Sequence, residues 1–173
     1  MKSNYLATGF IAILFAAIGL YFGNSRAQAE TPSGAATRDF FAASLPDAKN
    51  QDQALAQYKG KILLVNFWAT WCHPCVQEMP ELSTLQSKGK INNFQIIGIG
   101  IDSAANIQEF ATKYKISYPL YIGGTGGSEL LRKMGDAAGG LPFSVLIGPD
   151  GQVKKTYLGS LKIEQVKRDV AAI

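Results

Sequence analysis

The sequence predicts an α/β domain with a mixed central sheet and helices on both faces. Two uninterrupted apolar runs rich in strand-forming residues, 62–68 and 94–102, are typical of strands that are buried on both sides. Apolar residues at helical spacing follow each run, and a hairpin with a closing helix ends the chain. Strands that alternate with helices favour parallel pairing, and the final hairpin adds antiparallel strands to the same sheet.

The elements before the first buried run are short. Residues 39–46, "DFFAASLP", are consistent with a short strand or an edge ribbon. Residues 52–61, "DQALAQYKGK", predict one helical turn that stops at Gly60. The run "ILLVNFW" at 62–68 then suits a strand in the middle of the sheet, because it offers apolar side chains to both faces.

A helix is expected after this strand, and Gly89 is its natural end. Apolar residues recur along it at three-residue steps: Val76, Met79, Leu82 and Leu85. The run "FQIIGIGID" at 94–102 predicts the second buried strand. Asp102 or Ser103 can cap the helix that follows it.

The second half of the chain supplies the remaining elements. Residues 118–123, "YPLYIG", predict a short strand, and "GGTGG" at 123–127 predicts a loop. Residues 128–135 predict a short helix capped by Ser128, and 143–159 predict a hairpin around a Gly-Pro-Asp-Gly turn. A closing helix has these apolar residues on one side: Ile163, Val166 and Val170.

The beginning of the chain is apolar and has no charge between Tyr5 and Phe22. This length is at the lower limit for a membrane-spanning helix, so residues 1–23 predict a single transmembrane anchor or an uncleaved signal. Lys2 favours a cytoplasmic position for the N-terminus. The alternative is a soluble periplasmic protein released by cleavage near Ala29, after the small-x-small sequence "AQA".

Residues 24–38 are small, polar and unpatterned, which predicts a flexible linker to one folded domain at 39–173. The chain has 173 residues, of which 47% are hydrophobic, and this is enough for one domain with a core. Its net charge is +4, but the lysines are scattered, so no nucleic-acid partner is predicted. An anchor would place the domain in the periplasm, on the inner (cytoplasmic) membrane.

The only two cysteines, Cys72 and Cys75, flank a His-Pro pair directly after the first buried strand. A helix that starts at Cys72 would surround this residue with free N–H groups and the positive end of its dipole, which favour a thiolate. We therefore predict that Cys72 is the nucleophile and that Cys75, one turn further and shielded, is the resolving thiol. Pro74 suits the first helical turn, and a protonated His73 would tune the reduction potential.

Other cysteine chemistries fit this chain less well. A structural zinc site requires four Cys or His ligands, and two cysteines with one histidine do not predict a metal site. A Cys-His hydrolase needs a second histidine elsewhere, and Val76 stands where heme attachment requires histidine. A bridge across so short a loop constrains the unfolded chain little, which disfavours a purely stabilising disulfide. No cofactor is expected.

Three motifs together resemble the TlpA/ResA-like group of membrane-anchored thiol–disulfide oxidoreductases. They are "GKILLVNFWATWCHPC" at 60–75, "EMPEL" at 78–82 and "GLPFSVLIGPDG" at 140–151. The resemblance runs from about residue 39 to the end and implies a thioredoxin fold. It also implies that 102–122 carries the extra helix and strand of the TlpA-like insertion, between the second core strand and the cis-proline strand.

The resemblance implies further residue roles. Pro142 matches the family's cis-proline, which lies against the active-site disulfide and leaves nearby backbone free to pair with an extended substrate. Three residues are expected to bind substrate: Trp71, Leu141 and Pro142. Glu78 matches the family's acidic residue three positions after the second cysteine. Asn66 replaces the buried aspartate of cytoplasmic thioredoxins, which leaves Glu78, with a pKa raised by partial burial, as the base for Cys75.

Two residues depart from the family pattern. His73 replaces a commoner small or acidic residue, so the reduction potential does not carry over from the family. Phe143 replaces a small polar residue, which predicts a more apolar substrate groove.

The expected function is that of an extracytoplasmic protein-disulfide oxidoreductase that acts as a monomer. It would reduce disulfides in exported proteins, with apocytochrome c as one candidate, and a membrane dithiol donor would recharge it. His73 leaves a disulfide-forming oxidant as one alternative. A thiol-based copper-binding chaperone is the other.

Overall fold

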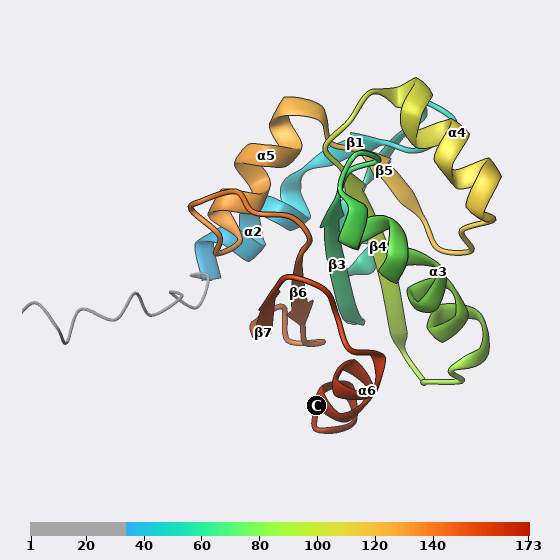
Figure 1. Ribbon diagram of the computed structural model, residues 1–173. Coiled ribbons are helices and arrows are strands. Elements are labelled where there is room, and N and C mark those ends of the chain that lie inside the picture. Colours follow the sequence, from blue (N-terminus) through green and yellow to red (C-terminus); the bar gives the residue numbers. More distant parts are fainter. Residues whose placement is uncertain (1–33) are drawn as a thin grey trace, which may run out of the picture. The chain divides into compact units, whose positions relative to one another are not determined.

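A five-stranded sheet forms the centre of the part of the chain that the computed structural model describes, residues 34–173 (Figure 1). Its strands are β3 (Ile62–Trp68), β4 (Phe94–Gly100), β5 (Leu120–Ile122), β6 (Phe143–Ile147) and β7 (Val153–Leu158). In the order β5-β4-β3-β6-β7, the first three strands are parallel, and β6 is antiparallel to both β3 and β7. The predicted mixed sheet is confirmed.

The middle strand β3 is almost entirely apolar because helices cover both faces of the sheet. Every β3 residue after the first is buried. Alternate side chains point to opposite faces, so Leu63 packs in one core cluster and Leu64 in the other. Asn66 is the one polar residue of the strand, and its cross-strand partners are Gly98 in β4 and Ser144 in β6.

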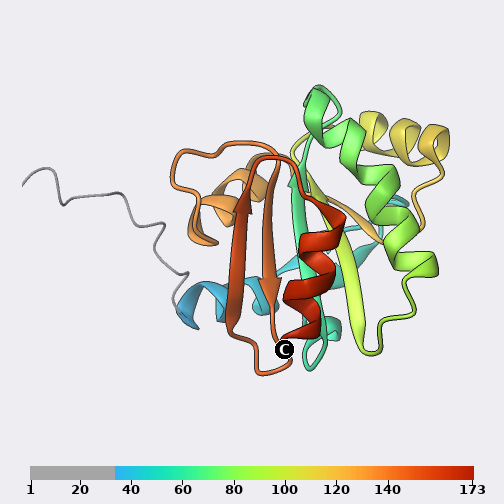
Figure 2. The ribbon, with the colours of Figure 1, turned by 60° about the horizontal axis from the view of Figure 1, so that its bottom comes forward.

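Helices α3 (His73–Lys88), α4 (Ala104–Tyr114) and α6 (Ile163–Ala171) contribute to the core on one face of the sheet. Figure 2 shows α3 and α6 lying across that face. Ser103 caps α4 as predicted, because its hydroxyl accepts a hydrogen bond from the N–H of Asn106 at 3.2 Å. This face carries the buried groups that surround the cysteines.

The other face is covered by α2 (Gly34–Ala42), the short 3-10 helix η1 (Leu55–Tyr58) and α5 (Gly124–Lys133). A two-stranded antiparallel ribbon, β1 (Ser44–Pro46) and β2 (Asp52–Ala54), lies between α2 and η1 in the sequence. The single helical turn predicted within 52–61 is therefore η1, and the residues before it form a strand instead.

Helix α2 differs from the prediction. The sequence predicts a linker to residue 38 and a strand over 39–46, whereas the chain is helical from Gly34 to Ala42. Phe40 and Phe41 are buried against the sheet, with ring centroids 5.1 Å apart. The folded part of the chain therefore includes residues 34–38. Packing of the apolar side of α2 against the sheet stabilises this helix, which intrinsic helix propensity does not predict.

Helix α5 also differs from the prediction, because its first turn contains the "GGTGG" residues expected to form a loop. The helix begins at Gly124 rather than after Ser128. A Cβ at Gly123 would lie 2.7 Å from Ile99 Cγ2, and one at Gly127 would lie 3.4 Å from the same atom. The glycines thus let the start of α5 lie directly on β4, and this contact outweighs their low helix propensity.

The predicted anchor or signal at 1–23, the cleavage site near Ala29 and the linker at 24–33 lie outside the described residues. Between Gly34 and Ile173, no helix is long and apolar enough to cross a membrane. Helix α4 and strand β5 lie within 102–122. Their assignment to the TlpA-like insertion stays a prediction.

Replacing Phe40 with alanine is expected to lower the free energy of unfolding by roughly 3–5 kcal/mol, because the ring is fully buried. Urea denaturation of the full-length protein, followed by tryptophan fluorescence, measures the change. The control is Asp39→Ala on the same helix, which removes only an exposed ion pair with Lys133 and should cost less than about 1 kcal/mol. Equal, small effects of both changes would mean that α2 is not part of the core.

Candidate active site

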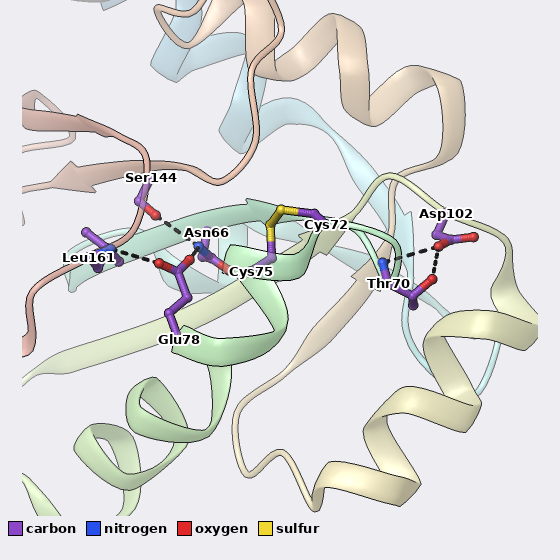
Figure 3. Close-up of a disulfide and its surroundings, with 8 residues drawn as sticks. All are labelled: Asn66, Thr70, Cys72, Cys75, Glu78, Asp102, Ser144 and Leu161. Atoms are coloured by element: carbon purple, nitrogen blue, oxygen red, sulfur yellow. Dashed lines mark hydrogen bonds between the residues drawn. A yellow bond between two sulfur atoms is a disulfide. The ribbon is translucent and has the colours of Figure 1, made fainter.

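Cys72 and Cys75 form a disulfide at the start of α3, with their Cα atoms 5.3 Å apart (Figure 3). Strand β3 ends at Trp68, and a tight turn follows in which the N–H of Cys72 donates to the carbonyl of Ala69 at 3.2 Å. Cys72 is the N-cap of α3 and makes no side-chain capping hydrogen bond. Its sulfur therefore lies at the positive end of the helix dipole, which stabilises a thiolate.

The two cysteines differ in exposure to solvent. Cys72 retains an exposed fraction of 6%, whereas Cys75 has none. Trp71, directly before Cys72, is 69% exposed and stands out from the surface. Cys72 is therefore the more exposed of the two cysteines, as the positions of the two residues on the helix predict.

His73 and Pro74 occupy the exposed first turn of α3. The His73 Nε2 atom lies 3.1 Å from Nε2 of Gln77, one helical turn further on. Pro74 lacks an N–H at a position where the helix has no partner for one, so it does not weaken α3.

A buried polar network lies one turn below the disulfide (Figure 3). Asn66 Nδ2 donates to Glu78 Oε1 at 2.8 Å and to Ser144 Oγ at 3.0 Å. The second carboxylate oxygen, Glu78 Oε2, accepts from the N–H of Leu161 at 2.8 Å. Both oxygens of Glu78 thus accept hydrogen bonds from uncharged donors that lie far apart in the sequence.

Burial raises the pKa of Glu78 above its ordinary value, and the nearby charge of Glu81 adds to this effect. The hydrogen bonds from Leu161 and Asn66 act in the opposite direction because they stabilise the carboxylate, but burial outweighs them. Cys75 and Glu78 are three residues apart on α3 and therefore share a face of the helix. A carboxyl group with a raised pKa next to a buried thiol is suited to exchange a proton with it.

The Leu141–Pro142 peptide bond is cis, as the family resemblance implies. The carbonyl of Pro142 accepts from the N–H of Gly159 at 2.9 Å, while the N–H and carbonyl of Leu141 have no backbone partner within residues 34–173. The prediction for Phe143 is wrong: its ring is buried and lies 6.2 Å from that of Phe67, so it belongs to the core and not to a substrate groove.

A groove of about 460 Å³ lies between the active-site turn and α4. Its walls include Trp71 and His73 from the cysteine side and Glu109, Lys113 and Tyr114 from α4. The groove therefore combines aromatic surface with charges of both signs, directly beside the disulfide.

Three contacts in the site are absent from the sequence-based prediction. They are the hydrogen bond from Asn66 to the Ser144 hydroxyl, the one from the Leu161 N–H to Glu78, and those from Thr70 to Asp102. The hydroxyl and the N–H of Thr70 both donate to Asp102 Oδ2, which ties the active-site turn to the start of α4. Ser144 carries a usable signal, because a lone polar residue in the apolar strand "FSVLI" faces the lone polar residue of "ILLVNFW". A backbone N–H such as that of Leu161 carries none.

No group of three or more His, Cys, Asp or Glu side chains in the described residues is arranged to hold a metal ion. The donor set at the disulfide consists of two sulfurs, with the one histidine turned along the helix toward Gln77.

Comparisons with known proteins agree with this geometry. The Redoxin family model matches residues 28–172. The chain is 28% identical to thiol-disulfide oxidoreductase ResA of Geobacillus thermodenitrificans over 171 residues, which cover 97% of this chain and 94% of that protein. It is 31% identical to ResA of Bacillus anthracis over 172 residues, which cover 96% and 95% of the two chains.

A solved thiol:disulfide interchange protein of the thioredoxin family, from Chlorobium tepidum, matches with a TM-score of 0.67 at 26% identity. The match covers 75% of this chain and 91% of that chain. The chain belongs to the Redoxin family and is a thiol–disulfide oxidoreductase of the ResA type with a thioredoxin fold.

Proposed function

We propose that this protein reduces disulfide bonds in exported polypeptides, with Cys72 as the attacking and Cys75 as the resolving cysteine. The observation that carries the proposal is the asymmetry of the site. The less buried cysteine, Cys72, lies at a helix N-terminus, and the fully buried Cys75 lies one turn before the buried carboxyl group of Glu78. The two thiols therefore differ in their exposure to substrate and in the group that can take up their proton.

The proposed reaction has two exchange steps. The Cys72 thiolate attacks one sulfur of the substrate disulfide, forms a mixed disulfide with it and releases the other substrate sulfur as a thiolate. The Cys75 thiolate then attacks Cys72 Sγ, forms the Cys72–Cys75 disulfide and releases the second substrate thiolate. Two electrons pass from the protein dithiol to the substrate, which leaves the protein oxidised.

The second step requires Cys75 to lose its proton in a site without solvent access. We assign this proton to Glu78, whose carboxylate shares a helix face with Cys75 and is held by Asn66 and Leu161. The raised pKa of Glu78 brings its proton affinity closer to that of a thiol, which makes transfer between them less unfavourable.

The substrate is proposed to lie across Trp71, Leu141 and Pro142. The unpaired backbone groups of Leu141 offer one donor and one acceptor to an extended segment. Side chains next to the target cysteine would enter the groove between Trp71 and α4. Apocytochrome c, whose paired cysteines must be reduced before heme attachment, is a candidate of this kind.

The proposed location is the outer side of the cytoplasmic membrane. The uncharged stretch from Tyr5 to Phe22 supports a tether there, and a membrane dithiol donor would return electrons to the Cys72–Cys75 pair after each cycle. Cell fractionation with N-terminal sequencing tests this location. A mature chain that starts at Glu30 would show cleavage after Ala29 instead of a retained anchor.

The equilibrium potential against glutathione tests the direction of electron flow. For a reductant we expect a reduction potential of about −270 mV. A potential of about −120 mV would instead identify a disulfide-forming oxidant. His73→Gln is the companion variant, because it removes the imidazole next to Cys72 but keeps a polar side chain within reach of Gln77. If His73 tunes the cysteine pair, this variant is expected to lower the reduction potential. An unchanged potential would mean that His73 is a surface residue without influence on the pair.

A further inference from the structure

Three buried side-chain polar atoms on one side of the sheet have no hydrogen-bond partner within residues 34–173. They are Asn66 Oδ1, Trp68 Nε1 and the Tyr118 hydroxyl. Buried polar atoms are satisfied in the great majority of native sites, because water otherwise solvates them better in the unfolded chain. Three such atoms close to the proposed proton carrier call for a common partner.

The three groups gather around Gly98. Asn66 and Trp68 alternate on β3 and point to the same face, and Gly98 is the cross-strand partner of Asn66 in β4. A Cβ built on Gly98 would lie 2.6 Å from Leu120 Cδ2, 3.1 Å from Trp68 Nε1 and 3.3 Å from Cε2 of Tyr118. The indole N–H and the tyrosine ring therefore both border the glycine that lies beside Asn66, and Leu120 fills the space directly over this glycine.

The hydrogen-bonding capacities of the three atoms match one water molecule. Trp68 Nε1 is a donor only, and Asn66 Oδ1 is an acceptor only, because Glu78 and Ser144 already fix which end of the amide is nitrogen. The Tyr118 hydroxyl stays protonated, since burial and the charge of Glu78 both raise the pKa of Tyr118. A water that accepts from Trp68 and Tyr118 and donates to Asn66 satisfies all three, with the three bonds typical of buried waters.

We propose that Asn66, Trp68 and Tyr118 bind one buried water molecule between their polar atoms, and that this water makes Tyr118 a positioning residue for Glu78. A hydrogen bond donated to Asn66 Oδ1 polarises the amide and strengthens the bond from its Nδ2 to Glu78 Oε1. Tyr118, which orients the water, thereby favours the carboxylate form of Glu78 from the far side of Asn66. The proposal rests on the function assigned to Glu78 above.

The other groups that act on Glu78 are few. On α3, Glu81 raises its pKa, and Cys75 is held in the disulfide. The segment before α6 contributes the uncharged N–H of Leu161, and β3 contributes the uncharged amide of Asn66. Tyr118 is a further titratable group near Glu78, and the charge of Glu78 raises the pKa of Tyr118. The Tyr118 hydroxyl is protonated and carries no net charge, so its loss is expected to act on Glu78 mainly through the water.

The variant Tyr118→Phe tests the positioning role. Weaker donation from Asn66 leaves the Glu78 carboxylate less stable, so the pH midpoint of the resolving step should move upward by roughly half a pH unit. The shift should vanish in a Glu78→Gln background, which a merely structural effect of the tyrosine would not predict. The matched control is Tyr58→Phe, which removes a buried hydroxyl from the core on the opposite face of the sheet.

The water itself is tested by NMR on the oxidised full-length wild type. The indole N–H of Trp68 should show a cross-peak to a long-lived water, whereas the exposed indole of Trp71 should show only exchange with bulk solvent. Absence of a bound water at Trp68 would overturn the site. A pH profile of Tyr118→Phe identical to that of Tyr58→Phe would overturn the positioning role. A wild type that reduces no disulfides would overturn the proposed function alone, because the indole measurement requires no turnover.

Discussion

Replacing Cys72 with serine is expected to abolish disulfide reduction by the protein. Only the slow, uncatalysed reduction by the dithiothreitol in the assay should remain. A serine hydroxyl is not ionised at neutral pH and cannot form a mixed disulfide, so the first exchange step has no nucleophile. Cys75 cannot substitute for it, because its sulfur is fully buried under the first turn of α3. Insulin reduction followed by turbidity measures the loss, with dithiothreitol as the source of electrons.

The partner variant, Cys75→Ser, separates the two steps. It keeps the accessible thiol at the helix N-terminus, so the first exchange should proceed and then stop at the mixed disulfide. Full insulin reduction by Cys72→Ser would contradict the assignment of the nucleophile. Normal turnover by Cys75→Ser would contradict the assignment of the resolving cysteine.

The second large effect is expected for Glu78→Gln, which should slow the resolving step by about 100-fold at neutral pH. In the wild type, the rate should rise with pH as Glu78 loses its proton, and the midpoint should lie above the ordinary value of 4.5 because burial raises the pKa. Below this midpoint the carboxyl group is protonated and cannot accept the proton of Cys75. The glutamine variant should lose this inflection and gain rate only as the thiol itself ionises, at about pH 8.5 or higher.

Glu81→Gln is the control for Glu78→Gln, because it removes one negative charge from the exposed side of the same helix. It should lower the midpoint slightly, since the charge of Glu81 raises the pKa of Glu78. Stopped-flow measurement of a preformed mixed disulfide isolates the resolving step for all three proteins. A glutamine variant with the rate and pH profile of the wild type would show that Cys75 loses its proton by another route.

The central strands β3, β4 and β6 could be read from the sequence because burial on both faces leaves a nearly unbroken apolar run. The run at 62–68 became β3, and 143–159 became the β6–β7 hairpin, each close to the predicted bounds. The helix after the cysteines was also readable, since its apolar positions recur at helical spacing up to Gly89. In each case, one local pattern and the tertiary environment favour the same structure.

Helices α2 and α5, which the sequence did not predict at these positions, show where local patterns are insufficient. The stretch 34–42 has small and polar residues that suit a linker, and only contact of Phe40 and Phe41 with the sheet makes it helical. The glycines at the start of α5 favour a loop by themselves, and only the close approach to Ile99 explains them. Both contacts join residues that are distant in the sequence, so no local pattern contains them.

The candidate site could be predicted in part. The cysteine pair, Glu78 and Pro142 were identified from motifs and from a family resemblance, and the structure brings the first three residues of that set together around α3. Asn66 and Ser144 are single polar residues in apolar strands, which marks them as partners once the pairing of the strands is known. The Leu161 N–H and the Tyr118 hydroxyl depend on how loops return to the sheet, and this information lies only in the three-dimensional structure.

The most direct test of the account is mass spectrometry of the reduced Cys75→Ser protein after reaction with a model peptide disulfide. The account predicts one peptide bound through a mixed disulfide on Cys72, stable until a reductant is added, while wild type treated in the same way releases the peptide and holds the Cys72–Cys75 disulfide. A Cys75→Ser protein that carries no peptide, under conditions in which the wild type becomes oxidised, would contradict it.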